Sequence, residues 1–134
     1  MLFPYHFDYP LTTSAVKIQR ENLKELECQY FSDYSVFELI ANRTQFCDDL
    51  LKQLWQQFEL DKANLTLIAV GGYGRQEMFP LSDLDVLILS KEERESETEE
   101  KIAQFVQFLW DCGFDVGHSV RSLEECEKEG KQDI

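Results

Sequence analysis

The sequence lacks the residue patterns that mark several common classes of protein. Its 134 residues include two histidines and three prolines, and no two of its four cysteines have the C-x-x-C spacing of zinc and redox motifs. Cysteine is also one of the residue types most often buried in a core. We therefore expect buried, reduced thiols, rather than disulfides or a metal site, at Cys28, Cys47, Cys112 and Cys126.

Long apolar runs are also missing. No segment is long and apolar enough to span a bilayer, and the N-terminus "MLFPYHFDYP" lacks the basic and apolar regions of a signal peptide. These absences predict a cytoplasmic protein with no membrane association.

Positive charge is scarce, since 13 basic residues face 26 acidic ones and the net charge is −13. A nucleic-acid-binding protein needs a basic face to neutralise phosphates, so the composition argues against that class. It leaves a nucleotide substrate open, because a metal ion can supply local positive charge. The 43% hydrophobic residues, among them ten Phe, indicate one globular domain with a true core.

Apolar periodicity predicts helices and strands in an order typical of an α/β (α+β) domain with a small mixed sheet and flanking helices. "DVLIL" is nearly continuous in apolar residues, as a strand buried on both faces would be. An irregular leader over 1–13 precedes the first helix. The expected elements are helices over 14–30, over 34–59 (whole, or broken near Asn42), over 96–110 and after 122, and strands over 65–70, 84–89 and 114–121.

Helix-capping and helix-ending residues predict some of these boundaries. Ser96 with Glu99, and Ser122 with Glu125, have the spacing of capping boxes that open helices. Gly113 is placed to end the helix before the third strand.

The stretch "AVGGYGRQEMFPLSDLDVLIL" holds the candidate chemistry. Asp83 and Asp85 are two residues apart, so on a strand both project from one face, and a hard divalent cation would relieve their repulsion. Gly71, Gly72 and Gly74 follow a strand and allow backbone N–H groups to approach a ligand. If "GRQEM" begins a short helix, its N-terminus favours a phosphate. Together these features predict metal-assisted phosphoryl or nucleotidyl transfer.

Other phosphate-binding motifs fit less well. The sequence has no GxxxxGK[ST] and therefore no P-loop. Gly72-Tyr73-Gly74 is followed by Arg75-Gln76-Glu77, so a G-x-G-x-x-G fingerprint fails at its third glycine.

These residues carry a resemblance. Gly71-Gly72, ten intervening residues and Asp83-Leu84-Asp85 resemble the signature of the DNA polymerase β-like nucleotidyltransferase superfamily. The central motif together with "LWDCGFDVGHSVRSLEEC" is similar to the N-terminal nucleotidyltransferase domain of bacterial PII uridylyltransferase/uridylyl-removing enzymes. The resemblance covers residues 15–134. It implies a polymerase β-like fold over 1–134, in an N-terminal fragment of a longer enzyme whose later segments include an HD domain and two ACT domains.

The resemblance also implies an activity. Family members use Mg²⁺ to transfer UMP from UTP to a tyrosine of the PII nitrogen-signalling protein. Gly71 and Gly72 match the phosphate-cradling turn, and Asp83 and Asp85 match the metal-binding pair. Three further positions, Arg75, Glu77 and Ser82, match flanking motif residues and are candidate nucleotide contacts.

Superfamily members usually add a third acidic residue on a later strand. Asp115 is the first candidate here, with Asp133 or a residue beyond the sequence as alternatives. His118 falls on the opposite face from Asp115, beside Val116 and Val120, which favours a core or semi-buried histidine over a catalytic one.

Two other readings stay open. One is another small nucleotidyltransferase, which the "GHSVR" segment disfavours. The other is a non-catalytic module that binds a nucleotide or a partner, which the uncertain third acid keeps in view. If the enzyme reading is right, we expect this chain alone to be a poor catalyst.

Overall fold

The computed structural model describes residues 5, 7–29, 32–33, 35–74, 83–91 and 95–124. The elements follow the order that the sequence predicts, with a 3₁₀ turn and a one-turn helix added. They are α1 (Thr13–Gln29), α2 (Val36–Gln57), η1 (Leu60–Lys62), β1 (Leu65–Ala69), α3 (Gly71–Gly74), β2 (Leu84–Ser90), α4 (Ser96–Asp111) and β3 (Val116–Ser122).

The three predicted strands share one mixed sheet in the order β1-β2-β3. β1 pairs antiparallel with β2, and β2 pairs parallel with β3. A parallel neighbour needs a long crossover, and α4 supplies it between β2 and β3. This arrangement confirms the predicted class, a small mixed sheet with flanking helices.

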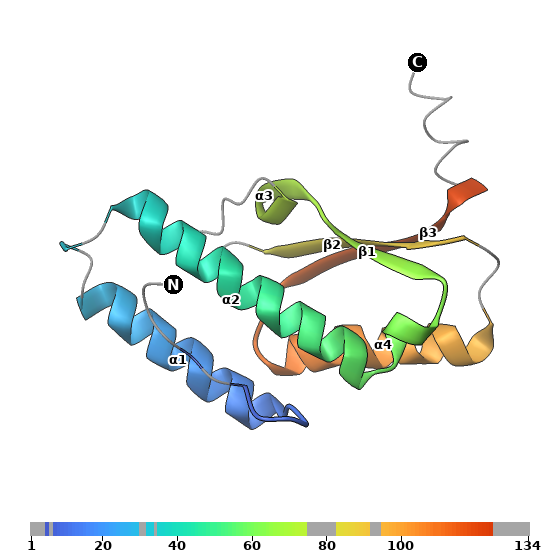
Figure 1. Cartoon of the computed structure of the whole chain (residues 1–134), viewed down its shortest axis with the longest axis horizontal. Helices are drawn as coiled ribbons and strands as arrows, with labels where there is room; N and C mark the ends of the chain where they lie inside the picture. Colours follow the sequence, from blue (N-terminus) through green and yellow to red (C-terminus); the bar gives the residue numbers. More distant parts are fainter. Residues whose placement is uncertain are drawn as a thin grey trace, which may run out of the picture.

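Helices α2 and α4 lie on one side of the sheet, and α1 packs outside them (Figure 1). Trp55 of α2 meets Phe105 of α4 edge to face, with ring centroids 5.6 Å apart, so aromatic packing joins the two helices. Helix α2 is continuous past Asn42, so the break considered there does not occur. The fully buried side chains of this layer include Phe46, Leu50, Leu54, Phe105, Leu109 and, from the sheet, Leu84, Val86 and Ile88.

The helix ends show one correct and one wrong prediction. Gly113 has a φ of +90° and its N–H bonds to Trp110 O, which ends α4 as expected. Ser96, however, is the first residue of α4 rather than its cap, because Glu95 occupies the N-cap position without a side-chain hydrogen bond. The capping box that forms is Ser35 with Glu38 at the start of α2, a spacing equally visible in "SVFE".

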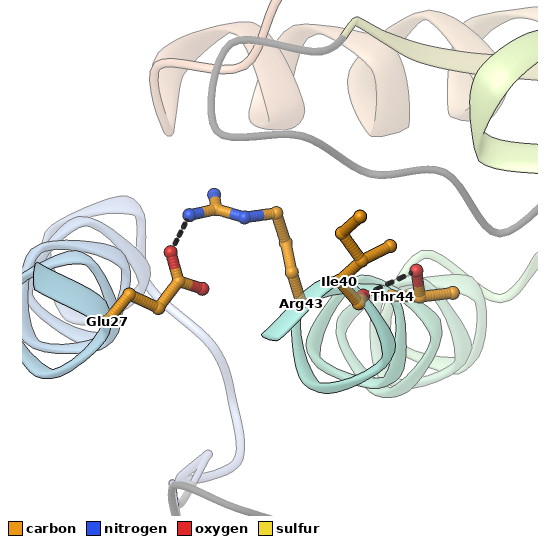
Figure 2. A network of polar contacts seen from close by, with 4 residues as sticks. All are labelled: Glu27, Ile40, Arg43 and Thr44. Atoms are coloured by element: carbon orange, nitrogen blue, oxygen red, sulfur yellow. Dashed lines mark hydrogen bonds and ion pairs between the residues drawn. The ribbon is translucent and has the colours of Figure 1, made fainter. Parts of the chain in front are cut away.

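An ion pair in the helical layer ties α1 to α2. Figure 2 shows Arg43 of α2 donating to the Glu27 carboxylate of α1, and Thr44 donating to the carbonyl of Ile40 one turn earlier. Both charged side chains are largely buried. Burial raises the pKa of Glu27, and the neighbouring Arg43 only partly offsets this effect.

The described residues before α1, Tyr5 and 7–12, are irregular, as predicted, but they pack on the core. The Tyr5 hydroxyl bonds to Asp49, and the Tyr5 ring meets Phe46 edge to face. Leu11 is buried, and its backbone exchanges two hydrogen bonds with Gln57. Side chains of α2 therefore hold this leader in place.

Several expectations about burial are wrong. β2 is not buried on both faces, because its residues alternate between buried and partly buried. His118 is exposed: on β3, Val116 is buried, residues 117–119 are exposed and residues 120–122 are partly buried. Cys47 and Cys112 are buried free thiols as expected, but Cys28 is exposed on α1. Leu123 and Glu124 are helical, directly after Ser122 as expected, whereas Cys126, Asp133 and the rest of that expected helix lie outside the described residues.

Candidate functional site

Asp83 and Asp85 lie at the start of β2, the central strand. Asp83 directly precedes the strand and is exposed, whereas Asp85 is its second residue and is partly buried. Leu84 and Val86, which alternate with them, are almost fully buried under the helices. The predicted division therefore holds, with the apolar residues facing the core and Asp85 facing the other side of the sheet.

The Asp85 carboxylate lies between two glycines from different elements. In the register of the sheet, Gly117 of β3 is directly opposite Asp85. A Cβ added to Gly117 would overlap Oδ1 of Asp85, well inside the 3.0 Å that real Cβ atoms keep. A Cβ added to Gly71 would lie 2.7 Å from Oδ2 of the same side chain. The carboxylate thus fills a notch that side chains at either position would close.

Gly71 is required for a second reason. Its φ of +60° is a left-handed conformation that side-chain-bearing residues rarely adopt. Val70 N–H bonds to Asp85 O, and Gly74 N–H bonds back to Val70 O, so the turn is anchored to the start of β2. The glycine turn and Asp85 are therefore neighbours, as the motif predicts.

The helical turn begins earlier than the sequence suggests. α3 spans Gly71–Gly74, so helical structure begins three residues before the "GRQEM" segment that the sequence offered as a possible helix start. Gly72 lies inside α3, one residue after the close approach to Asp85. Arg75, Glu77 and Ser82 lie outside the described residues, so their proposed nucleotide contacts stay predictions.

Asp115 lies next to the carboxylate pair along the sheet. Its carbonyl accepts a hydrogen bond from Leu84 N–H at 2.8 Å, which places it just before β3, beside the start of β2. Its side chain is exposed. Among the residues that the structure describes, no group of three His, Cys, Asp or Glu side chains is arranged so that it could hold a metal ion. Asp115 as a third ligand therefore stays a prediction without support from this geometry.

The chemistry of the donor pair suits a hard cation. Mg²⁺ is commonly held by one or two carboxylates, with waters and substrate phosphates completing its octahedral shell. Asp83 and Asp85 supply such carboxylates, and the notch fixes the second of them beside the glycine turn. This pair therefore fits Mg²⁺ when phosphate oxygens from a nucleotide share the ion.

Gly117 is a site residue that the sequence motifs do not identify. A glycine inside a strand weakens it and often marks a place where another group approaches closely. Gly117, within "DVGHSVR", was the available signal, but its partner could be assigned only once the parallel register with Asp85 was known.

Residues 22–120 match the family described as "Putative nucleotidyltransferase DUF294". The match covers most of the chain, and the chain belongs to this nucleotidyltransferase family. No solved structure matches it. Within the described residues, the helices are too short or too polar to cross a membrane.

The chain is also similar to named proteins. The chain is 64% identical, over its whole length, to "Bifunctional uridylyltransferase/uridylyl-removing enzyme" of Haemophilus influenzae (strain PittEE) and of Pasteurella multocida (strain Pm70). It is 42% identical over 98% of its length to the protein of the same name in Vibrio cholerae. The chain spans about 16% of the length of the first two relatives and 15% of the third. These three relatives therefore have much longer chains than this one.

Proposed function

We propose that this chain is the nucleotidyltransferase domain of a PII uridylyltransferase, and that it transfers UMP from UTP to a tyrosine of the PII protein. The observation that carries the proposal is the Asp85 carboxylate held between Gly71 and Gly117, two residues after Asp83. Identity of 64% to proteins named uridylyltransferases supports the choice of nucleotide.

In this proposal, Asp83 and Asp85 bind Mg²⁺, and the turn at Gly71 and Gly72 lies against the phosphates. The ion would neutralise phosphate charge and lower the pKa of the attacking hydroxyl. The protein's own part is to hold the carboxylates still, since transfer of this kind depends mainly on positioning and charge. The reaction joins the tyrosine oxygen to the α-phosphorus of UTP and releases pyrophosphate.

The charge of the chain supports a role for a cation. With a net charge of −13, the protein repels a free nucleoside triphosphate at long range. Asp83 and Asp85 add to this repulsion at the site itself. Nucleotide binding should therefore require the divalent ion.

The test incubates the full-length protein that carries this domain with α-labelled UTP, Mg²⁺ and a PII protein. The full-length Haemophilus influenzae relative is the positive control. Label on a PII tyrosine that is lost in the Asp85→Asn variant of the tested protein supports the proposal. Transfer from another nucleotide or to another acceptor would favour a different small nucleotidyltransferase and overturn it.

One observation favours a second candidate, a non-catalytic module that binds nucleotide or partner. The described residues offer two adjacent carboxylates but no three-residue metal group. Binding of UTP with Mg²⁺ by the full-length protein, without transfer to any acceptor, would favour this module instead.

A further inference from the structure

We propose that Gly117 is a positioning residue that keeps open the space in which the Asp85 carboxylate lies. The expected effect on metal binding rests on the proposed function. The steric contact between position 117 and Asp85 does not. Gly117 faces Asp85 directly across the parallel pair of β2 and β3. Side chains of directly opposite residues lie on the same face of a sheet, so a side chain at 117 would enter the space of the carboxylate.

The overlap would be severe at one atom and mild at the next. The added Cβ at 117 would collide with Oδ1 but would lie 3.5 Å from Cγ, an ordinary contact. The Asp85 side chain would therefore have to rotate or shift its carboxylate. Its other oxygen, Oδ2, lies close to Gly71, where an added Cβ would be 2.7 Å away.

The backbone gives no other reason for glycine at 117. Gly71 and Gly113 have positive φ, whereas Gly117 does not and lies within a regular strand. Alanine in a strand interior is normally more favourable than glycine, because glycine loses more conformational freedom on folding. The close approach of Asp85 is therefore the feature of the fold that explains this glycine.

The expected consequence is a displaced metal ligand in Gly117→Ala. Residues that orient a metal ligand typically change metal affinity about 10- to 100-fold when they are altered. We expect at least about a tenfold higher Mg²⁺ concentration for half of the metal-dependent rise in melting temperature. Ser119→Ala is the matched control, since Ser119 is two residues along the same face of β3 but is opposite Leu87.

Unfolding without metal tests the steric cause directly. In a double-mutant cycle by denaturant unfolding, Gly117→Ala should destabilise the wild-type chain but be neutral or stabilising in the Asp85→Ala background. An equal effect in both backgrounds would overturn the proposal, because the cost would not involve Asp85. If Gly117→Ala alone fails to fold, folding of the double variant supports the proposal and failure of both overturns it.

The metal titration separates this inference from the proposed function. Asp85→Asn that retains the Mg²⁺-dependent rise in melting temperature would contradict the metal assignment, while the unfolding cycle would still decide the role of Gly117. If Asp85→Asn loses the rise but Gly117→Ala keeps the wild-type midpoint, the metal assignment stands and Gly117 is not a positioning residue.

Discussion

The two faces of the three-stranded sheet differ in burial and in the kind of residue that they carry. On β2, Leu84, Val86 and Ile88 are at most 1% exposed and pack under the helices. The residues that alternate with them, among them Asp85 and Leu87, are only partly buried on the other face. One strand thus supplies both the centre of the core and the candidate chemistry, and a period of two keeps them apart.

This separation means that stability and activity should respond to different residues. Apolar burial is the main favourable term in folding, and on β2 it is concentrated on the helix-covered face. The other face carries Asp85, whose carboxylate lies in the notch between Gly71 and Gly117. Substitutions on the helix-covered face should therefore lower stability, whereas substitution of the aspartates should lower activity and leave stability unchanged or higher.

The largest expected effect is a loss of activity from substitutions at Asp83 and Asp85. Asp85 lies on the less buried face of the sheet, called the open face below. In the full-length protein, Asp83→Asn and Asp85→Asn should each lower uridylyl transfer at least about 100-fold, because a bound metal supplies several kcal/mol of charge stabilisation. Unfolding without metal should show equal or higher stability, since repulsion between the two carboxylates is relieved. The measurements are labelled transfer from UTP and thermal unfolding in a chelator. Either variant with the wild-type transfer rate would remove its aspartate from the metal site.

Local signals in the sequence predicted the aspartate pair, the glycine turn and the helix end at Gly113, because each depends on a few adjacent residues. The same kind of signal misplaced the start of α4, where Ser96 and Glu99 have the right spacing but Glu95 occupies the cap position. Spacing alone does not decide which residue leaves the helical conformation.

Other features depend on partners distant in the chain. The run "DVLIL" does not reveal that, among the described residues, one face of β2 is buried and the other only partly so, since Leu87 and Leu89 on the less buried face are also apolar. Gly117 carried a signal whose meaning required the register with Asp85. His118 is opposite the buried Val86 in the register of the sheet and is nevertheless exposed, which no residue near it in the sequence indicates.

Thiol reactivity should follow the same boundary between the covered layer and the solvent. Burial raises the pKa of Cys47 and of Cys112 to about 12. At pH 8 only about one in 10⁴ of such thiols is ionised, and the thiolate is the reactive form. We expect iodoacetamide to alkylate the exposed Cys28 at least about 100-fold faster than Cys47 or Cys112, as followed by peptide mass spectrometry.

Unfolding provides the control for the thiols, since both buried cysteines should react at a rate similar to that of Cys28 in denaturant. Rapid alkylation of Cys47 in the folded chain would show that water reaches the layer between the helices and the sheet.

A matched pair of substitutions on β2 compares how much each face of the sheet contributes to the free energy of unfolding. Ile88→Ala should lower the free energy of unfolding by about 2–5 kcal/mol, because it leaves a cavity at a fully buried position. Leu87→Ala, one residue away on the other face, should cost about 1 kcal/mol, since its side chain is already partly in water. Denaturant unfolding measures both. Similar costs would mean that the open face is covered by apolar contacts as extensive as those of the core.

The smallest expected effect concerns the buried ion pair in the helical layer. Burial raises the pKa of Glu27 more than Arg43 lowers it, so the folded chain binds that proton more tightly than the unfolded chain. The resulting stability is fully present below the unfolded pKa of about 4.3 and is lost as the pH rises through the folded pKa. The free energy of unfolding of wild type minus that of Glu27→Gln should therefore decrease as the pH rises from 4 to 7.

Denaturant unfolding of both proteins across this pH range measures that difference, with Glu25→Gln as the control for loss of an exposed carboxylate on the same helix. A difference that grows with pH would mean that attraction to Arg43 outweighs the cost of burial. The ion pair would then stabilise the contact between α1 and α2 at neutral pH. The decrease expected here means instead that apolar packing holds the two helices together and the ion pair fixes their relative position.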